Sequence, residues 1–317
     1  VNVYENRIYI MSEGTMNQNY IGRKINGIRD MDVLSNAHKR EYNVLLQGPT
    51  GSAKTMVAQQ YAKQYNYDLV VVPCSVSTEP SQLFGRYIPK EDSDGFVWND
   101  GVITELLRKM DNGESDGGVL VLDEINMADP RVAASLYSMM DRNRVLHLID
   151  RKEDIPNGNL LIIGTMNPGY RGTRDLNKAL SNRFNYIINW GYDDSVENRI
   201  SHSPSLLKVI SELRSGMQQG EFQSPFSTNM LIEFHDNYND FGFDFAVSMA
   251  ANKYREEERD SVVKIFEVRK SSIINEFQNY KKPTNVKDMS NEFKNKKLFD
   301  FGWKGICLLY TSPSPRD

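Results

Sequence analysis

An eight-residue stretch, GPTGSAKT at positions 48–55, contains the residue types that proteins use to bind phosphate. It follows the apolar run NVLLQ (43–47) and precedes a helical pattern over 55–65, so it connects a strand to a helix. In that context backbone N–H groups at the helix N-terminus point at a bound anion, and the Lys54 ammonium group adds a positive charge. The Thr55 hydroxyl can serve as an oxygen ligand of Mg²⁺. We assign nucleotide binding to the whole stretch: Gly48, Pro49, Thr50, Gly51, Ser52, Ala53, Lys54 and Thr55.

Ala53 departs from the strict phosphate-loop pattern, G-x-x-x-x-G-K-[ST], which has glycine at this place. A methyl group there would cost about 1 kcal/mol if the backbone required a positive φ. We therefore predict that Ala53 has a negative φ, at or near the first turn of the following helix. Gly48 and Gly51 are then expected to make the sharp turns, where a Cβ atom would clash.

A second pattern, GGVLVLDEIN at 117–126, places two carboxylates at the end of an apolar strand. This placement is unfavourable unless the acids meet a cation or water. We predict that Asp123 holds Mg²⁺ together with Thr55, and that Glu124 polarises an attacking water as a general base. Acids that merely cap a helix N-terminus are a weaker interpretation, because the distance from Lys54 leaves room for an intervening strand and helix.

Two further side chains could act on a terminal phosphate. Asn167 ends another apolar run, in LLIIGTMNPGYRG (160–172), where its amide could bond the γ-phosphate or the lytic water. An Asn-Pro pair that simply starts a loop is the alternative. Arg183 follows a short helical pattern and could reach the phosphate of a neighbouring subunit. Taken alone, Arg183 is better explained as a surface arginine.

The elements that must position these residues alternate between strand and helix. Each strand candidate is a continuous apolar run, which is typical of parallel strands buried on both faces. The candidates are 43–47, 68–73, 118–123, 159–165 and 184–189. We predict an α/β fold: the five-stranded parallel sheet of a P-loop NTPase flanked by helices, followed by a smaller all-helical lid.

The same patterns divide the chain into five parts. We expect an N-terminal arm and helix over 1–38, with the helix at 26–40, and a nucleotide-binding domain over 39–192. A helical lid over 193–270 and a polar helical tail over 271–306 follow. The last eleven residues, CLLYTSPSPRD (307–317), resemble a translated sequencing adapter, so they are left out of the fold prediction.

Composition restricts the class of protein. The chain has 317 residues with 39% hydrophobic content and a formal net charge of −4, which is ordinary for a globular protein and argues mildly against nucleic-acid binding. We see no apolar run that could span a membrane and no secretory signal pattern. Cys74 and Cys307 cannot form a disulfide framework, and Cys74 is expected to be a small buried residue. A cytoplasmic location is the resulting expectation.

Taken together, the motifs resemble those of AAA+ ATPases in the MoxR-like or dynein-related (midasin-like) branch, over roughly residues 39–260. The resemblance rests on GPTGSAKT, LFGRYIP…GFVWNDGVIT, VLVLDEINMADP, GTMNPGYRGTRDLNKALSNRF and SPFSTNML. It implies a hexameric ring with ATP and Mg²⁺ bound between subunits. It also makes Lys54 and Thr55 the Walker A pair, Asp123 and Glu124 the Walker B pair, Asn167 the first sensor and Arg183 the arginine finger.

The resemblance also identifies two inserts and two departures. The segments 95–104 and 145–163 look like the branch's helix insert and the hairpin before the first sensor, and either could face a pore or a client. Phe96 and Trp98, in the first insert, could equally pack locally. Relatives in this branch are expected to share Ala53, whereas Asn229 stands where the family has a second-sensor arginine. An amide cannot supply that charge, so either Arg214 or Arg255 substitutes for it or hydrolysis is slow.

Three functions stay open on this evidence. The leading one is an ATP-hydrolysing remodelling motor or chaperone that assembles with itself and acts on a protein client, in the family sometimes through a von Willebrand A-domain partner. The second is a nucleotide-dependent binding switch with weak hydrolysis, suggested by Asn229. The third is a nucleic-acid-acting ATPase of phage or restriction type, whose affinity would depend steeply on salt.

Overall fold

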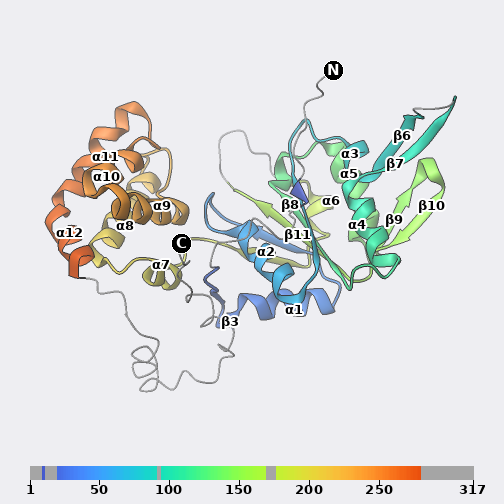
Figure 1. Ribbon diagram of the computed structural model, residues 1–317, viewed down its shortest axis with the longest axis horizontal. Coiled ribbons are helices and arrows are strands. Elements are labelled where there is room, and N and C mark those ends of the chain that lie inside the picture. Colours follow the sequence, from blue (N-terminus) through green and yellow to red (C-terminus); the bar gives the residue numbers. More distant parts are fainter. Residues whose placement is uncertain (1–8, 11–19, 91–93, 169–175, 280–317) are drawn as a thin grey trace, which may run out of the picture.

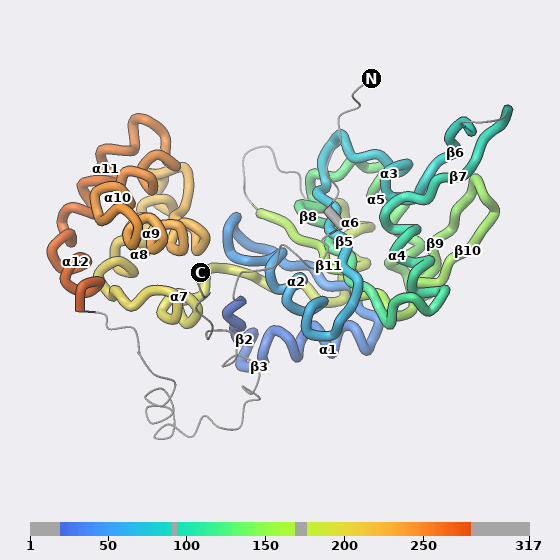
Figure 2. The backbone as a smooth tube through the Cα atoms, viewed as in Figure 1, coloured from blue at the N-terminus to red at the C-terminus, as the bar shows by residue number. Residues whose placement is uncertain are grey.

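The computed structural model describes residues 9–10, 20–90, 94–168 and 176–279. These residues form an α/β domain followed by a group of helices, α7 to α12, which lies at one end of the molecule (Figures 1 and 2). Within the described ranges, every helix is too short or too polar to cross a membrane.

The centre of the α/β domain is one sheet whose strand order is β1-β5-β8-β11-β4-β12. Within this sheet, β5, β8, β11, β4 and β12 are parallel, whereas β1 pairs with β5 in the antiparallel direction. All five predicted strands are confirmed. Every residue of β11 is buried, which explains its continuous apolar run. The strands are β1 (Tyr9–Ile10), β4 (Val44–Gln47), β5 (Asp68–Pro73), β8 (Gly118–Asp123), β11 (Leu160–Met166) and β12 (Tyr186–Asn189).

Helices cover both faces of this sheet. On one face α1 (Asp30–Lys39) and α2 (Lys54–Tyr65) pack against alternate residues of β4, β8 and β11. On the other face α3 (Pro80–Phe84), α4 (Val102–Asp111) and α5 (Pro130–Met140) enclose a second apolar cluster. The sheet is therefore held rigidly between two cores, and its strand ends are fixed relative to one another.

The first helix begins later than the sequence suggested. The expected helix over 26–40 is preceded by a small hairpin of β2 (Lys24–Ile25) and β3 (Ile28–Arg29), which turns at Asn26 and Gly27 with φ of 49° and 86°. Asn-Gly is the strongest short hairpin signal, and it overrides the helical spacing of the apolar residues there. Helix α1 packs into the sheet core, so it belongs to the α/β domain and not to a separate arm.

Two hairpins project from the end of the α/β domain that lies away from the lid (Figure 1). One consists of β6 (Gly85–Pro89) and β7 (Phe96–Asp100), the other of β9 (Val145–Leu148) and β10 (Glu153–Pro156). Arg108 joins them, with Nε 2.6 Å from Asp100 and Nη1 2.8 Å from Glu153. Local packing holds for Trp98, which packs against the core, but not for Phe96, which is 67% exposed. A role of this insert toward a pore or a client stays a prediction.

The lid is helical throughout its described length and has its own apolar core. Helix α12 belongs to it, because Ile273 is fully buried in that core and Glu276 accepts hydrogen bonds from Ser203 and Ser205. The lid thus extends to Asn279, beyond the boundary expected at 270; the remaining tail and the adapter-like segment lie outside the described residues. Its helices are α7 (Asp194–Ile200), α8 (Pro204–Gln218), α9 (Thr228–Phe241), α10 (Phe243–Ala251), α11 (Glu256–Val268) and α12 (Lys270–Asn279).

Candidate functional site

The predicted site residues meet where three neighbouring strands end. Strand β11 lies between β8 and β4, and all three run in the same direction. Asp123 is the last residue of β8, Gly48 follows β4, and Asn167 follows β11. Carboxyl ends of parallel strands are the usual place for a ligand in an open α/β sheet.

Lys54 is a buried cation surrounded by neutral oxygen atoms. Its Nζ atom donates to the carbonyl groups of Gly48 (2.9 Å) and Pro49 (2.7 Å) and to the Asn167 amide oxygen (2.7 Å). Burial lowers the pKa of Lys54 to about 8, partly opposed by the charges of Asp123 and Glu124. Among the ion pairs of the described residues none involves Lys54. This arrangement favours a negatively charged ligand.

The two glycines of the loop are required for different reasons. A Cβ atom on Gly48 would lie 1.9 Å from the Trp190 carbonyl oxygen. Gly51 has φ of 70°, and its Cβ would lie 2.7 Å from Cβ of Ser227 in the lid. Gly48 therefore permits a close approach to the segment after β12, and Gly51 makes the turn under the lid.

The prediction for Ala53 is wrong: it adopts the left-handed conformation, with φ of 67° and ψ of 29°, immediately before α2. The cause lies in the residue before it. The Ser52 carbonyl accepts from Trp190 Nε1 (2.8 Å) and from the Arg23 guanidinium (3.1 Å), which fixes the orientation of that peptide group. The chain then needs a left-handed residue to enter the helix, at a cost of about 1 kcal/mol for alanine.

Thr55 and Asp123 come together as predicted for a metal site. The Thr55 hydroxyl donates to Oδ1 of Asp123 over 3.1 Å. A hydroxyl and a carboxylate are hard oxygen ligands, which fit Mg²⁺ shared with phosphate groups and waters. No cluster of three or more His, Cys, Asp or Glu side chains occurs in the described part of the chain.

Asn167 connects the loop, the lysine and the second acid through one buried amide. Its Nδ2 donates to Glu124 Oε1 (3.0 Å) and to the Thr50 hydroxyl (3.1 Å), while its oxygen accepts from Lys54. Glu124 itself has a left-handed backbone, with φ of 54°. The predicted phosphate-binding cation and the predicted general base are thus linked by a single side chain.

Arg183 lies apart from this cluster in its own chain. It follows α6 (Lys178–Ser181), and its Nε atom is 2.9 Å from Oδ1 of Asp141. Its guanidinium also lies 4.0 Å from the centre of the Tyr137 ring. The role suggested for it concerns a neighbouring subunit, so that role stays a prediction.

The lid meets the phosphate loop with uncharged groups. The Asn229 backbone N–H faces the Gly51 carbonyl at 3.4 Å, and Ser227 lies against the same glycine. Arg214, one candidate replacement for the missing arginine, is held by Glu197 at 2.6 Å and 2.8 Å and by the Phe226 carbonyl. The other, Arg255, lies before α11 beside Glu257.

Residues that the sequence did not reveal hold the loop from outside. Arg23 bonds the Gly191 carbonyl (2.6 Å) as well as Ser52, and it stacks on Trp190 at 4.2 Å. The Tyr192 hydroxyl donates to the Thr50 carbonyl (3.0 Å). These contacts go to backbone atoms, so residue types in the loop give no sign of them. Thr165, buried beside Asp123, had a signal: it is a polar residue two positions before Asn167 on one strand face.

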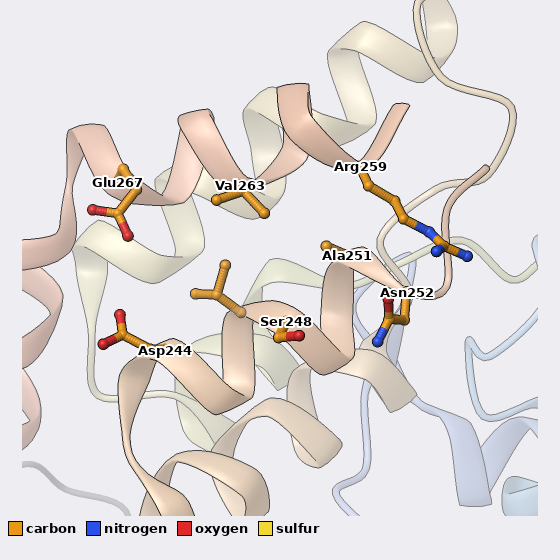
Figure 3. Close-up of a pocket in the computed structure, with 8 residues that line it drawn as sticks. Asp244, Ser248, Ala251, Asn252, Arg259, Val263 and Glu267 are labelled. Atoms are coloured by element: carbon orange, nitrogen blue, oxygen red, sulfur yellow. The ribbon is translucent and has the colours of Figure 1, made fainter. Parts of the chain in front are cut away.

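Two other features lie outside the site. Cys74 is 5% exposed, so the expected small buried cysteine is confirmed, and burial raises the pKa of its thiol to about 12. A hollow of about 250 Å³ lies between α10 and α11 of the lid (Figure 3). Lys270 already neutralises Asp244 and Glu267 at one end of this hollow. It contains none of the predicted site residues.

Comparisons with known proteins agree with this site. The protein-family model of the AAA domain (dynein-related subfamily) matches residues 43–184 of this chain. The chain is similar to an uncharacterized protein of Staphylococcus haemolyticus (strain JCSC1435), with 30% identity over 258 residues that cover 76% of this chain and 94% of that protein. An uncharacterized protein of Staphylococcus saprophyticus is 29% identical over 262 residues, which cover 77% and 95% of the two chains. A crystal structure from Cytophaga hutchinsonii has 18% identity and a TM-score of 0.41, covering 79% of this chain and 88% of that one, a likeness too low to carry an argument.

The fold and the site define a P-loop nucleotide-binding protein with a helical lid. The chain belongs to the dynein-related subfamily of AAA+ ATPases, of the MoxR-like kind.

Proposed function

We propose that this protein is an ATP-hydrolysing motor that works as a ring and remodels a protein client. The observation that carries the proposal is the contact between Lys54 and Glu124 through the Asn167 amide. It supports the proposal because a cation suited to phosphate and an acid suited to proton transfer lie together, as hydrolysis of a nucleotide requires. Thr55 and Asp123 lie beside them as a suitable pair for Mg²⁺.

Binding would begin at the start of α2. The first backbone N–H groups of that helix have no partner within it, and its dipole favours negative charge. Lys54 would exchange its bonds to the Gly48 and Pro49 carbonyls for bonds to phosphate oxygens. The chemistry that Mg²⁺ supplies at such a site is charge neutralisation on the phosphate oxygens.

Hydrolysis would then depend on Glu124 and Asn167. The Glu124 carboxylate accepts a proton from the attacking water, a contribution of about 10²–10⁴-fold to the rate. The Asn167 amide, already bonded to Glu124, orients that acid and the water toward the terminal phosphate. Arg183 would stabilise the developing charge in the site of an adjacent subunit after leaving Asp141.

The client would be bound by the two projecting hairpins. Four exposed apolar side chains lie there, which supports a contact with polypeptide: Tyr87 (49% exposed), Phe96 (67%), Val97 (45%) and Ile149 (85%). Arg108 ties the hairpins together, so a movement of one is passed to the other. A von Willebrand A-domain partner remains an expectation that rests on the family resemblance.

The test is steady-state ATP turnover of Glu124→Gln, with ATP binding measured separately. We expect turnover to fall at least about 100-fold while ATP affinity is retained, because the amide cannot accept the proton. Glu105→Gln, a neutralised acid on the exposed side of α4, is the matched control and should turn over like the wild type. Unchanged turnover in Glu124→Gln would exclude this chain as the source of hydrolysis. Sedimentation velocity with and without ATP tests the ring.

A nucleotide-dependent binding switch is the second candidate, and the uncharged contact of Asn229 and Ser227 with Gly51 favours it. A lid without an arginine at the phosphates closes over ATP yet contributes little to the transition state. In that case wild-type turnover is slow, and Asn229→Arg accelerates it. If Asn229→Arg leaves a slow turnover unchanged, the lid contact is not the cause.

A further inference from the structure

Thr165 is a completely buried hydroxyl residue near the end of β11. The register of the sheet pairs Leu122 of β8 with Gly164 of β11, which places Thr165 beside Asp123. Every other residue of that strand except the glycine is apolar or sulfur-containing. A hydroxyl at this depth has to be hydrogen-bonded, and its partners decide what it does.

The direction of each hydrogen bond at Thr165 follows from chemistry. The Glu124 backbone N–H lies 3.0 Å from the Thr165 hydroxyl oxygen, and a backbone N–H can only donate. The hydroxyl proton is therefore free to donate to Oδ1 of Asp123, at 2.6 Å. One hydroxyl thus accepts from the residue predicted as general base and donates to the residue predicted to hold the metal.

Both acids gain a fixed orientation from this hydroxyl. Oδ1 of Asp123 accepts from Thr165 and from Thr55, whereas Oδ2 has no hydrogen bond to any described residue. Oδ2 would thus be the carboxylate oxygen available to hold a metal-bound water. Glu124 turns back from the strand with a left-handed φ of 54°, a conformation that its N–H bond to Thr165 holds in place.

We propose that Thr165 is a positioning residue for the reaction, which sets the Asp123 carboxylate for Mg²⁺ and the Glu124 turn for proton transfer through one shared hydroxyl. The proposal rests on the function proposed above. It predicts that the hydroxyl, and not the methyl group or the shape of the side chain, is the part of Thr165 that matters. A residue that only filled the core would show the opposite preference.

The experiment compares Thr165→Val, which keeps the shape, with Thr165→Ser, which keeps the hydroxyl. Thr104→Val is the matched control, because Thr104 is equally buried and its hydroxyl donates to the Phe84 carbonyl (2.7 Å), away from the acids. Two readouts need no turnover: hydrogen–deuterium exchange of the peptide that contains residue 124, and ATP affinity in EDTA against a Mg²⁺ titration. Turnover is the third.

We expect Thr165→Val to raise the Mg²⁺ concentration for half-maximal tightening of ATP binding by about 10-fold or more, since loss of a residue that orients a metal ligand typically has effects of about 10–100-fold. Turnover should fall by a similar factor. Exchange at residue 124 should become faster, and ATP affinity in EDTA should not change. Thr165→Ser and Thr104→Val should both resemble the wild type in all three readouts.

Two results would overturn the proposal: a wild-type Mg²⁺ titration and exchange rate in Thr165→Val, or equal defects in the Ser and Val variants. Should the Val variant fail to fold, Thr165→Ala against Thr165→Ser isolates the same hydroxyl, because these two differ by that group alone. Failure of the proposed hydrolysis would appear separately, as unchanged turnover in Glu124→Gln. The exchange and Mg²⁺ readouts would still decide the role of Thr165.

Discussion

Replacing Ala53 with glycine tests the backbone of the phosphate loop directly. The sequence predicted an ordinary negative φ at this position, whereas the structure shows φ of 67°. Ala53→Gly removes one methyl group and no hydrogen-bonding atom. It therefore changes the free energy of unfolding only through backbone conformation and local packing.

A positive and a negative φ at Ala53 predict opposite signs for the change in the free energy of unfolding in Ala53→Gly. A left-handed alanine is strained by roughly 1–2 kcal/mol, which glycine relieves. Glycine also makes the unfolded chain more flexible, which lowers stability by about 0.4–1 kcal/mol. The net expectation is a stabilisation between about 0 and 1.6 kcal/mol, centred near about 0.8 kcal/mol. With a negative φ only the second effect remains, and Ala53→Gly would destabilise the protein.

Urea unfolding followed by tryptophan fluorescence measures this change in the domain concerned. Trp98 and Trp190 both lie in the α/β domain, and a Trp303→Phe background removes the tryptophan of the C-terminal tail. That choice matters because the α/β domain and the lid need not unfold in one transition. ATP affinity should be measured in parallel, since the loop is also the predicted binding site.

Ala134→Gly is the control. Ala134 is an exposed residue inside α5, where glycine should destabilise by about 1 kcal/mol relative to alanine. The expected outcome is therefore a difference in sign between two substitutions of the same chemistry. If Ala53→Gly destabilises as much as Ala134→Gly does, the left-handed conformation of Ala53 is refuted.

Two further predictions concern charge. Because burial lowers the pKa of Lys54 to about 8 and bound phosphate favours its charged form, ATP affinity should decrease as pH rises through 8. Calorimetric titration from pH 7 to 9.5 checks this, with Lys63→Met on the exposed side of α2 as the control. A constant ATP affinity over this range would contradict the prediction. Glu197 is 3% exposed and pairs with Arg214 and the Thr228 hydroxyl. Glu197→Gln should therefore destabilise the lid by about 3 kcal/mol, because it leaves the partly buried Arg214 guanidinium without its counter-charge. Thermal melting should show this loss and its partial recovery in Glu197→Gln combined with Arg214→Met; equal melting of wild type and Glu197→Gln would count against it.

Sequence patterns predicted the strands and the meeting of the acids because both depend on burial. Parallel strands covered on both faces must be apolar along their length, so a polar residue at the end of such a run marks the edge of the sheet. Asp123, Glu124 and Asn167 each stand at or directly after the end of a run of this kind. The strand order and register then bring them together, with Asn167 bonded to Glu124 at 3.0 Å.

Sequence patterns could not predict the conformation of the loop, because it is set by hydrogen bonds from distant residues to backbone atoms of the loop. Trp190 and Arg23 both donate to the Ser52 carbonyl, and that carbonyl would look the same with any residue at position 52. Local preference favoured a negative φ at Ala53, and these tertiary hydrogen bonds outweighed it. For the same reason, the sequence did not predict that the Trp190 backbone lies close to Gly48.

The charge around the loop links the structure to the proposed ring. Among the described side chains that bond the loop, Lys54 and Arg23 are the cations, and Arg23 is occupied with the Ser52 and Gly191 carbonyls. From the lid, the uncharged Ser227 and Asn229 lie against Gly51, whereas Arg214 is neutralised by Glu197. Even with Mg²⁺ bound, ATP carries more negative charge than one lysine balances, so efficient hydrolysis would need a further cation from elsewhere. An arginine of a second subunit would supply that cation. If Arg183 acts in trans in this way, ATP turnover per subunit should rise with protein concentration.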